Sequence, residues 1–202
     1  MMVVGLTGSI AMGKSETAKL FAGLGIPVFD SDADVHRQYS KGGEAVIAVQ
    51  AIFPEAVVEG QVDRRRLSQM VLADPAAMQR LEEIVHPIVK KHEEQFLQRC
   101  QQEGHPIAVL DIPLLFETRR EKDVDCVVVV SAPLGMQRQR ALERPEMTLE
   151  KLDRILKCQV PDPEQRRRAN FVVDTSQGSE HALAQVRQIV VRLKSTNRDR
   201  QL

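Results

Sequence analysis

The sequence predicts an α/β fold with three layers, in which about five mostly parallel strands form a sheet covered by helices on both faces. Two observations support this prediction. Helical segments separate the strands along the chain, as crossover connections between parallel strands require. Five short segments are also continuously apolar, which is typical of strands buried on both faces of a sheet: residues 2–7, 27–30, 107–111, 124–130 and 171–174.

The helices nearest the first two strands have clear boundaries. Residues 14–22 place Ala18, Phe21 and Ala22 on one face, and two glycines end this helix at positions 23 and 25. A second helix is expected at residues 33–39, directly after the second strand.

Residues 40–104 interrupt the alternation of strand and helix, because they contain several helical patterns and no convincing strand. This stretch is too long for a single crossover. Asp74 and Pro75 are a typical helix start, and we expect the helix that follows to run to about residue 101. We therefore expect one domain, residues 1–202, with a mostly helical lobe inserted at residues 40–104.

Two arginine-rich helices are expected after the fourth strand, at residues 134–144 and 149–168. Pro145 separates them, and Pro161 and Pro163 punctuate the second one. Residues 195–202 are expected to form a frayed tail.

Composition excludes several classes of protein. The 202 residues carry no net charge, 28% are charged, 43% are hydrophobic and only 3% are aromatic. These values indicate a globular domain and argue against disorder and against bulk nucleic-acid binding. The longest apolar run, residues 126–130, is far too short to cross a membrane. Three widely spaced cysteines suggest neither disulfides nor zinc, so we expect reduced thiols in a cytoplasmic protein.

The loop at residues 8–15 carries the strongest chemical signal. Gly8, Gly13, Lys14 and Ser15 have the spacing of a phosphate-binding loop (P-loop), and this loop falls between a predicted strand and a predicted helix. Backbone N–H groups and the helix N-terminus cradle phosphate, the lysine reaches the β- and γ-phosphates, and the hydroxyl binds Mg²⁺. The alternative is a glycine-rich turn with an exposed lysine.

Nucleotide binding leaves open a small-molecule kinase, a switch GTPase or a motor ATPase. The chain contains neither the Asn-Lys-x-Asp string that reads guanine nor the Leu-Ser-Gly-Gly-Gln signature of transporter ATPases. A small-molecule kinase requires a carboxylate beside the acceptor hydroxyl, a pocket for the acceptor, and arginines over the transferred phosphoryl group.

Asp30 and Asp32 are the carboxylate candidates, because they follow the second strand, and ligands of doubly wound sheets bind beyond the carboxyl ends of strands. One of them can orient and deprotonate an acceptor hydroxyl. Both can equally be N-cap residues of the next helix, and the sequence alone does not separate the two interpretations.

The arginine candidates lie in the helix after the fourth strand. Gln137, Arg140 and Arg144 share one face of that helix, and residues 134–170 contain nine Lys and Arg against six Asp and Glu. Guanidinium groups are suited to bidentate phosphate contacts. The alternative for any single arginine is a solvated helix face, and Arg166, Arg167 and Arg168 are expected to be surface residues.

Five strings stand in the order and approximate spacing of dephospho-coenzyme A kinases: residues 4–15, 25–32, 81–87, 111–117 and 137–140. The chain resembles this family over about residues 3–190. The resemblance implies a P-loop NTPase core (residues 1–39, 105–133 and 169–194), a substrate-binding insert (40–104) and an arginine-bearing lid (134–168). It also implies transfer of the γ-phosphoryl group of ATP to the ribose 3′-hydroxyl of dephospho-coenzyme A.

The same resemblance assigns residues to roles. It implies that Lys14, Asp32 and Arg140 are catalytic and that Ser15 binds Mg²⁺. The implied ATP contacts are Gly8, Ala11, Met12, Gly13, Lys14, Ser15, Glu16, Arg140 and Arg144. The implied acceptor contacts are Asp32, His86, Pro113, Leu114, Leu115 and Glu117. For His86, a structural role in the inserted lobe is expected rather than direct catalysis.

The chain departs from the family pattern at two places. The family loop usually reads Gly-Gly-Ile-Gly-Ser-Gly-Lys-Ser/Thr-Thr, whereas this chain has Ser9, Ala11, Met12 and Glu16. Near the end, the family has Ala-Asp and later Asp-Asn, where this chain has Ala169-Asn170 and Asp174-Thr175.

Two other functions stay open on the sequence alone: a nucleoside or nucleotide monophosphate kinase, and a nucleotide-binding regulatory module without catalysis. The expected partners are ATP and a small-molecule substrate, with no nucleic acid and no membrane. The chain is expected to be a monomer or a weak homo-oligomer.

Overall fold

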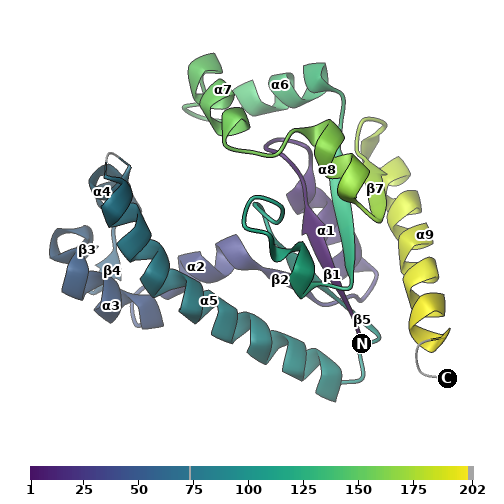
Figure 1. Cartoon of the computed structure of the whole chain (residues 1–202), viewed down its shortest axis with the longest axis horizontal. Coiled ribbons are helices and arrows are strands. Elements are labelled where there is room, and N and C mark those ends of the chain that lie inside the picture. The colour runs from purple at the N-terminus through teal and green to yellow at the C-terminus, as the bar shows by residue number, and fades with distance from the viewer. Residues whose placement is uncertain (73, 200–202) are drawn as a thin grey trace. The chain divides into compact units, whose positions relative to one another are not determined.

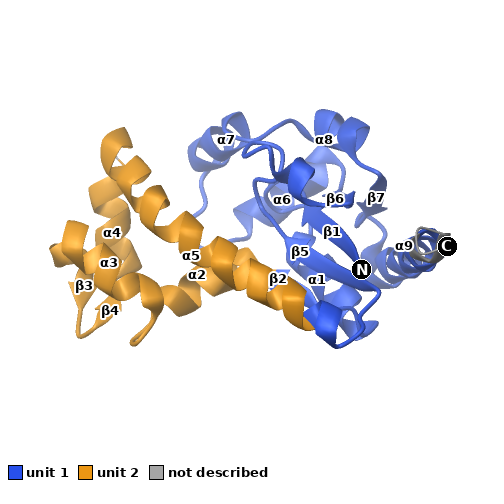
Figure 2. Cartoon of the chain, turned by 60° about the horizontal axis from the view of Figure 1, so that its bottom comes forward, with its two compact units in different colours: residues 1–29, 100–202 blue, residues 30–99 orange. Residues whose placement is uncertain are grey.

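The computed structural model describes residues 1–72 and 74–199 and divides the chain into two compact units. One unit contains Met1–Phe29 and Cys100 onward, and the other contains Asp30–Arg99 (Figure 2). The first unit carries the sheet and the phosphate-binding loop.

The sheet of the first unit confirms the predicted α/β fold. Its five strands run in the order β2-β5-β1-β6-β7, with β1 at the centre (Figure 1). β1 pairs in parallel with both β5 and β6, and β6 pairs in parallel with β7. The strands are β1 (Met2–Thr7), β2 (Val28–Asp30), β5 (Ile107–Asp111), β6 (Cys126–Ser131) and β7 (Phe171–Asp174).

The two helices α1 (Lys14–Gly23) and α9 (Gly178–Asp199) pack against each other and against the sheet. Val4 and Leu6 of β1 are fully buried in the same apolar cluster as Phe21 of α1 and Val186 of α9. On the other side of β1 the chain is crowded at Gly5, where an added Cβ atom would lie 2.5 Å from Leu115 Cδ1. This core fixes the end of β1 from which the phosphate-binding loop departs.

Residues 134–168 form three helices rather than two long ones: α6 (Leu134–Leu142), α7 (Leu149–Lys157) and α8 (Asp162–Arg168). The second predicted helix, residues 149–168, is therefore interrupted at residues 158–161. Pro161 and Pro163 explain the break, since proline is favoured in the first turn of a helix and destabilises its interior. A short 3-10 turn, η2 (Arg120–Asp123), precedes β6.

The second unit is mostly helical, as expected: α2 (Ser31–Tyr39), α3 (Glu44–Ile52), η1 (Pro54–Ala56), α4 (Arg64–Val71) and α5 (Pro75–Gln102). The start of α5 at Pro75 confirms the boundary predicted from Asp74 and Pro75, and the Asp74 carboxylate accepts the N–H of Ala76. The helices enclose their own apolar cluster, with Ala45, Val49 and Ala56 fully buried.

The expectation that this unit contains no strand is wrong. Two strands of two residues each, β3 (Val57–Val58) and β4 (Gln61–Val62), form an antiparallel hairpin. Its turn has positive φ angles at Glu59 (51°) and Gly60 (79°). Such turns usually contain Asn-Gly or Asp-Gly, and glutamate rarely adopts a positive φ angle. The Glu-Gly sequence therefore did not indicate a hairpin.

The C-terminal segment is more ordered than expected. Residues 195–199 continue helix α9, and the hydroxyls of Ser195 and Thr196 bond to the carbonyl of Arg192 within the helix. The remainder of the predicted tail, residues 200–202, lies outside the described residues. In the part of the chain that the structure describes, no helix has both the length and the apolar character of a membrane span.

The three cysteines differ in burial, which predicts their reactivity. Cys158 is exposed, whereas Cys100 and Cys126 are buried. Burial, with the Asp125 carboxylate as a second cause, raises the pKa of the Cys126 thiol from 9.0 to about 11. In folded protein at pH 8, Cys158 should react rapidly with a thiol-specific disulfide reagent, and the other two cysteines should react only after unfolding.

The raised pKa of Cys126 also makes the free energy of unfolding depend on pH. The folded state holds the proton more tightly than the unfolded state, so this contribution is complete below pH 9 and is lost as the pH rises toward about 11.

Rapid reaction of all three thiols in native protein would contradict the burial of Cys100 and Cys126. A Cys158→Ser variant, which should lose the rapid phase alone, is the control.

Candidate functional site

The phosphate-binding loop connects β1 to α1, and its curvature depends on three positions. Gly8 has no room for a side chain, because an added Cβ atom would lie 2.6 Å from the carbonyl oxygen of Val130. Ala11 and Gly13 both have positive φ angles, 61° and 97°. Gly13 is also the N-cap residue of α1. The chain therefore curls at the end of β1 and enters α1 with the helix N-terminus directed at the loop, as anion binding requires.

Two residues that depart from the family loop are buried against neighbouring elements. Ala11 belongs to a small apolar cluster with Ala141 of α6 and Leu152 of α7. Met12 is 2% exposed in the main core, and its sulfur lies 3.1 Å from the backbone nitrogen of Ala132, which donates to it. Both residues are therefore accommodated by packing against neighbouring elements.

Lys14, the first residue of α1, forms an ion pair with Asp111. Asp111 is the last residue of β5, the strand beside β1, and its side chain is 2% exposed. The sequence analysis did not assign a role to Asp111. A signal was present, because a carboxylate ends the apolar run of residues 107–111. That the two residues meet depends on β5 lying next to β1, a pairing that the sequence pattern does not give.

Ser15 and Glu16, the next two residues of α1, are exposed. The Glu16 carboxylate accepts from Lys19, 2.7 Å away, on the solvent side of the helix. Ser15 is in the position expected of a Mg²⁺-binding hydroxyl, one residue after the lysine, at the N-terminus of α1.

Arg140 of α6 is held by Thr175, the residue after β7. Its guanidinium group donates to the Thr175 hydroxyl and to the Thr175 carbonyl, both at 2.9 Å. The same hydroxyl donates to the carbonyl of Met12 at 2.7 Å. Thr175 thus joins Arg140 to the phosphate-binding loop. It is a site residue that the sequence analysis noted only as a departure from the family pattern.

A cavity of about 420 Å³ lies on this side of the loop. Five of the nine predicted ATP contacts line it: Ala11, Gly13, Glu16, Arg140 and Arg144. Thr175, which follows β7, closes it together with Gly178 and Ser179 at the start of α9. Its volume is in the range of small-molecule sites.

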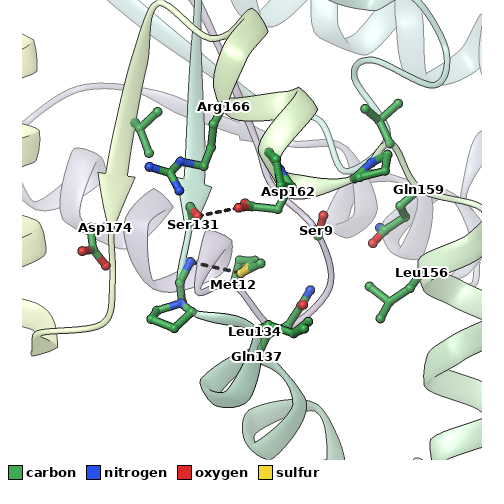
Figure 3. A pocket seen from close by; sticks show the side chains of 16 residues that line it. Ser9, Met12, Ser131, Leu134, Gln137, Leu156, Gln159, Asp162, Arg166 and Asp174 are labelled. Atoms are coloured by element: carbon green, nitrogen blue, oxygen red, sulfur yellow. Dashed lines mark hydrogen bonds between the residues drawn. The ribbon is translucent and has the colours of Figure 1, made fainter.

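A second cavity, of about 540 Å³, lies behind the loop (Figure 3). Ser9 and Met12 line it, together with residues at the carboxyl ends of β6 and β7 and around α8. The Ser176 hydroxyl and backbone N–H beside Asp174, one of its lining residues, hold the pKa of that carboxyl below its ordinary value. Lys14 and Ser15 line neither cavity, whereas Arg140 and Arg144 line only the smaller one.

The predicted acceptor contacts that follow β5 differ in what they touch. Leu115 is completely buried in the core of the first unit, whereas Leu114 is 42% exposed and Pro113 is half-buried. The Glu117 carboxylate accepts the backbone N–H of Val160 at 2.6 Å. Leu115 therefore supports this segment from behind, and Glu117 links it to the segment between α7 and α8.

The two candidate carboxylates after β2 are distinguished by their contacts. The Asp30 side chain caps α2 by accepting the N–H of Ala33 at 2.9 Å. Asp32, in the first turn of α2, is exposed and makes no side-chain hydrogen bond or ion pair within residues 1–72 and 74–199. The capping role belongs to Asp30, which leaves the Asp32 carboxylate available.

His86 is exposed on α5, and its side chain has no hydrogen bond or ion pair with any residue that the structure describes. The expected structural role of His86 therefore has no hydrogen bond or ion pair to support it among the described residues. Pro87 follows it inside α5 without ending the helix.

Comparisons with known proteins identify close relatives over almost the whole chain. The sequence model of the dephospho-CoA kinase family matches residues 2–181. A dephospho-CoA kinase of Rhodopseudomonas palustris (strain HaA2) is 56% identical over 190 residues, which cover 94% of each chain. The dephospho-CoA kinase of Mesorhizobium japonicum is 56% identical over 194 residues, covering 96% of this chain and 98% of the relative.

Solved structures agree with this result. The protein TT1252 from Thermus thermophilus superposes with a TM-score of 0.83 at 34% identity, covering 95% of this chain and 96% of the other. A dephospho-CoA kinase from Campylobacter jejuni has a TM-score of 0.72 at 21% identity, covering 96% and 98% of the two chains, which supports the fold alone.

The bonds of Thr175 predict a stability effect. A Thr175→Val variant keeps the shape of the side chain but removes the donor to the buried Met12 carbonyl and the acceptor of Arg140. We expect the free energy of unfolding to fall by about 1–3 kcal/mol, measured by urea denaturation. Thr175→Ser retains the hydroxyl and should keep most of this free energy. Equal losses in the two variants would show that the methyl group, and not the hydroxyl, matters.

Proposed function

The chain belongs to the dephospho-CoA kinase family, and we propose that it transfers the γ-phosphoryl group of ATP to the ribose 3′-hydroxyl of dephospho-coenzyme A. This reaction is the last step of coenzyme A biosynthesis. The observation that supports the proposal most directly is the loop of residues 8–15, which turns sharply into the N-terminus of α1 and contains Lys14.

In this proposal Lys14 and the loop bind the β- and γ-phosphates. The Lys14 side chain is 16% exposed, so it lies at the edge of the protein surface while paired with Asp111. Phosphate oxygens offer the ammonium group a second set of acceptors, and its charge offsets the charge that develops on the transferred group. Before ATP binds, the ion pair with Asp111 holds the lysine side chain near the loop.

We assign ATP to the cavity of about 420 Å³ beside the loop. Arg140 and Arg144 line this cavity, and both supply guanidinium groups to bound phosphate. Arg140 is oriented by its two bonds to Thr175, so less conformational entropy is lost when it meets the nucleotide. We propose that residues 134–168, which carry these arginines, serve as the lid.

The residues present also fit Mg²⁺, which kinases of this kind use with ATP. Mg²⁺ prefers oxygen ligands and usually takes only one or two from the protein, with the rest from phosphate and water. We assign two oxygen donors to Mg²⁺: the hydroxyl of Ser15, which follows Lys14, and the carboxylate of Asp111, which is paired with Lys14. Bound there, Mg²⁺ neutralises phosphate charge.

We assign the acceptor-side role to Asp32, the carboxylate that the family resemblance implies. The Asp32 carboxylate is exposed and free of polar contacts within the described residues, so it can accept a hydrogen bond from the attacking hydroxyl. In-line positioning by such a carboxylate contributes most of its effect through orientation. We also propose that the protein works in the cytoplasm, where thiols such as those of its three cysteines stay reduced.

Lys14→Ala should lower kcat by about a thousandfold or more, because the transferred phosphoryl group loses a preorganised positive charge. A coupled assay of ADP release with dephospho-coenzyme A measures this. The control is Lys194→Ala, an exposed lysine of α9 that lines neither cavity, which should leave kcat unchanged. A parent-like rate in Lys14→Ala would overturn the assignment.

The same variant should also be less stable, because it leaves the buried Asp111 carboxylate without its cation. Adding Asp111→Asn removes that charge. The double variant should therefore recover thermal stability but not turnover, which separates the two roles of Lys14.

Asp32→Asn should reduce kcat by about a hundredfold while changing the KM for ATP less than about twofold, since general-base and orienting effects act on the acceptor. The control is Asp30→Asn, which keeps the cap of α2 because asparagine caps as well as aspartate. Steady-state kinetics with both substrates varied gives these values. An unchanged kcat in Asp32→Asn would exclude a catalytic role for this carboxylate.

A further inference from the structure

The phosphate-binding loop is held from outside by side chains of the 134–168 segment. Gln159, between α7 and α8, accepts the backbone N–H of Ile10 at 3.0 Å. Gln137, on α6, donates from its side-chain nitrogen to the carbonyl oxygen of the same residue at 2.9 Å. Two glutamines thus satisfy both backbone polar groups of Ile10, in the loop of residues 8–15.

Further bonds connect this contact to the rest of the segment. Gln165 of α8 donates to the Ser9 hydroxyl at 3.0 Å and to the carbonyl of Val160 at 2.8 Å. The N–H of Val160 in turn donates to Glu117. The loop, the 159–160 connection and the segment after β5 are therefore joined by a continuous series of hydrogen bonds.

The direction of each bond is fixed by chemistry. A backbone N–H can only donate and a carbonyl oxygen can only accept, so Gln159 must present its oxygen and Gln137 its nitrogen. Gln137 is 2% exposed, so water does not replace its amide readily. A glutamine that only filled space would not need to donate or accept a hydrogen bond in this way.

Gln137 and Gln159 line the cavity of about 540 Å³ and not the cavity of about 420 Å³ that we assign to the nucleotide. Ile10 lies one residue before Ala11, whose positive φ angle turns the loop toward the cavity of about 420 Å³. Fixing the peptide groups on both sides of Ile10 removes conformers in which this turn is not made. Preorganising a binding loop raises affinity by removing an ordering cost.

We propose that Gln137 and Gln159 are positioning residues that hold the phosphate-binding loop in its nucleotide-binding conformation and so couple the 134–168 segment to ATP affinity. This inference rests on the proposed function only in that the loop binds ATP; it does not depend on which acceptor is phosphorylated. Gln159 acts as a hydrogen-bond acceptor and Gln137 as a donor.

The opposite polarities give a test. Gln159→Glu keeps an acceptor oxygen, and at pH 8 it should bind ATP within about threefold of the parent protein, whereas Gln159→Leu should bind about tenfold more weakly, as expected for one lost hydrogen bond. At position 137 glutamate cannot donate when ionised. Gln137→Glu and Gln137→Leu should therefore both weaken ATP binding by about tenfold or more.

Isothermal titration with ATP in the absence of acceptor measures these dissociation constants. Gln139, an exposed residue of α6 that bonds to Glu143 on the surface, supplies the matched control, since Gln139→Glu and Gln139→Leu should both leave ATP affinity unchanged. Thermal denaturation identifies variants that lose stability. Because Gln159 lies in a connection between helices and is only half-buried, the comparison at position 159 remains decisive if the variants at position 137 fail to fold.

Rescue by glutamate at position 159 supports the proposal. Equal affinities for Gln159→Glu, Gln159→Leu and the parent would overturn it, and so would equal losses for both substitutions at position 159, since they would indicate a requirement for glutamine shape and not for an acceptor. Failure of the parent protein to bind ATP would instead contradict the proposed function, so the two failures are distinguishable.

Discussion

The ion pair between Lys14 and Asp111 ties the phosphate-binding loop to the sheet on which the rest of the first unit is built. A carboxylate that is 2% exposed requires a compensating charge, and a lysine at the start of α1 provides one only if β5 lies beside β1. The strand order of the sheet is thus a condition for the chemistry. The same pair keeps the lysine close to the loop without a nucleotide, and a phosphate group can then share it at little cost in reorganisation.

The shape of the loop depends on contacts made on its two sides. On the outer side, which faces the cavity of about 540 Å³, lie Met12 and the glutamines on Ile10, and Ala11 packs against α6 and α7. On the inner side, Lys14 remains 16% exposed while paired with Asp111. A loop of eight residues rarely orders itself, because each fixed residue costs about 1–2 kcal/mol of conformational entropy. The outer contacts offset this cost before any ligand arrives.

Much of the fold was predictable because its signals are local. Five continuous apolar runs gave the five strands, and the Asp74-Pro75 pair gave the start of α5. The hairpin of β3 and β4 was missed because two-residue strands with a Glu-Gly turn carry almost no pattern. A different reason explains why some site residues were missed: Asp111, Thr175 and the two glutamines that contact the loop. Gln159 meets Ile10 from 149 residues away, and one sequence holds no record of such a pairing.

Ala11 illustrates how these contacts substitute for a residue that the family loop usually has. Its φ angle of 61° is one that glycine adopts freely and alanine only at a cost of about 1 kcal/mol. Its methyl group is packed with Ala141 and Leu152, both completely buried, and one buried methyl or methylene group is worth about 0.8 kcal/mol. The strain and the packing are therefore of similar size. The loop keeps its turn at Ala11 only while α6 and α7 lie against it, so its conformation is a property of both segments together.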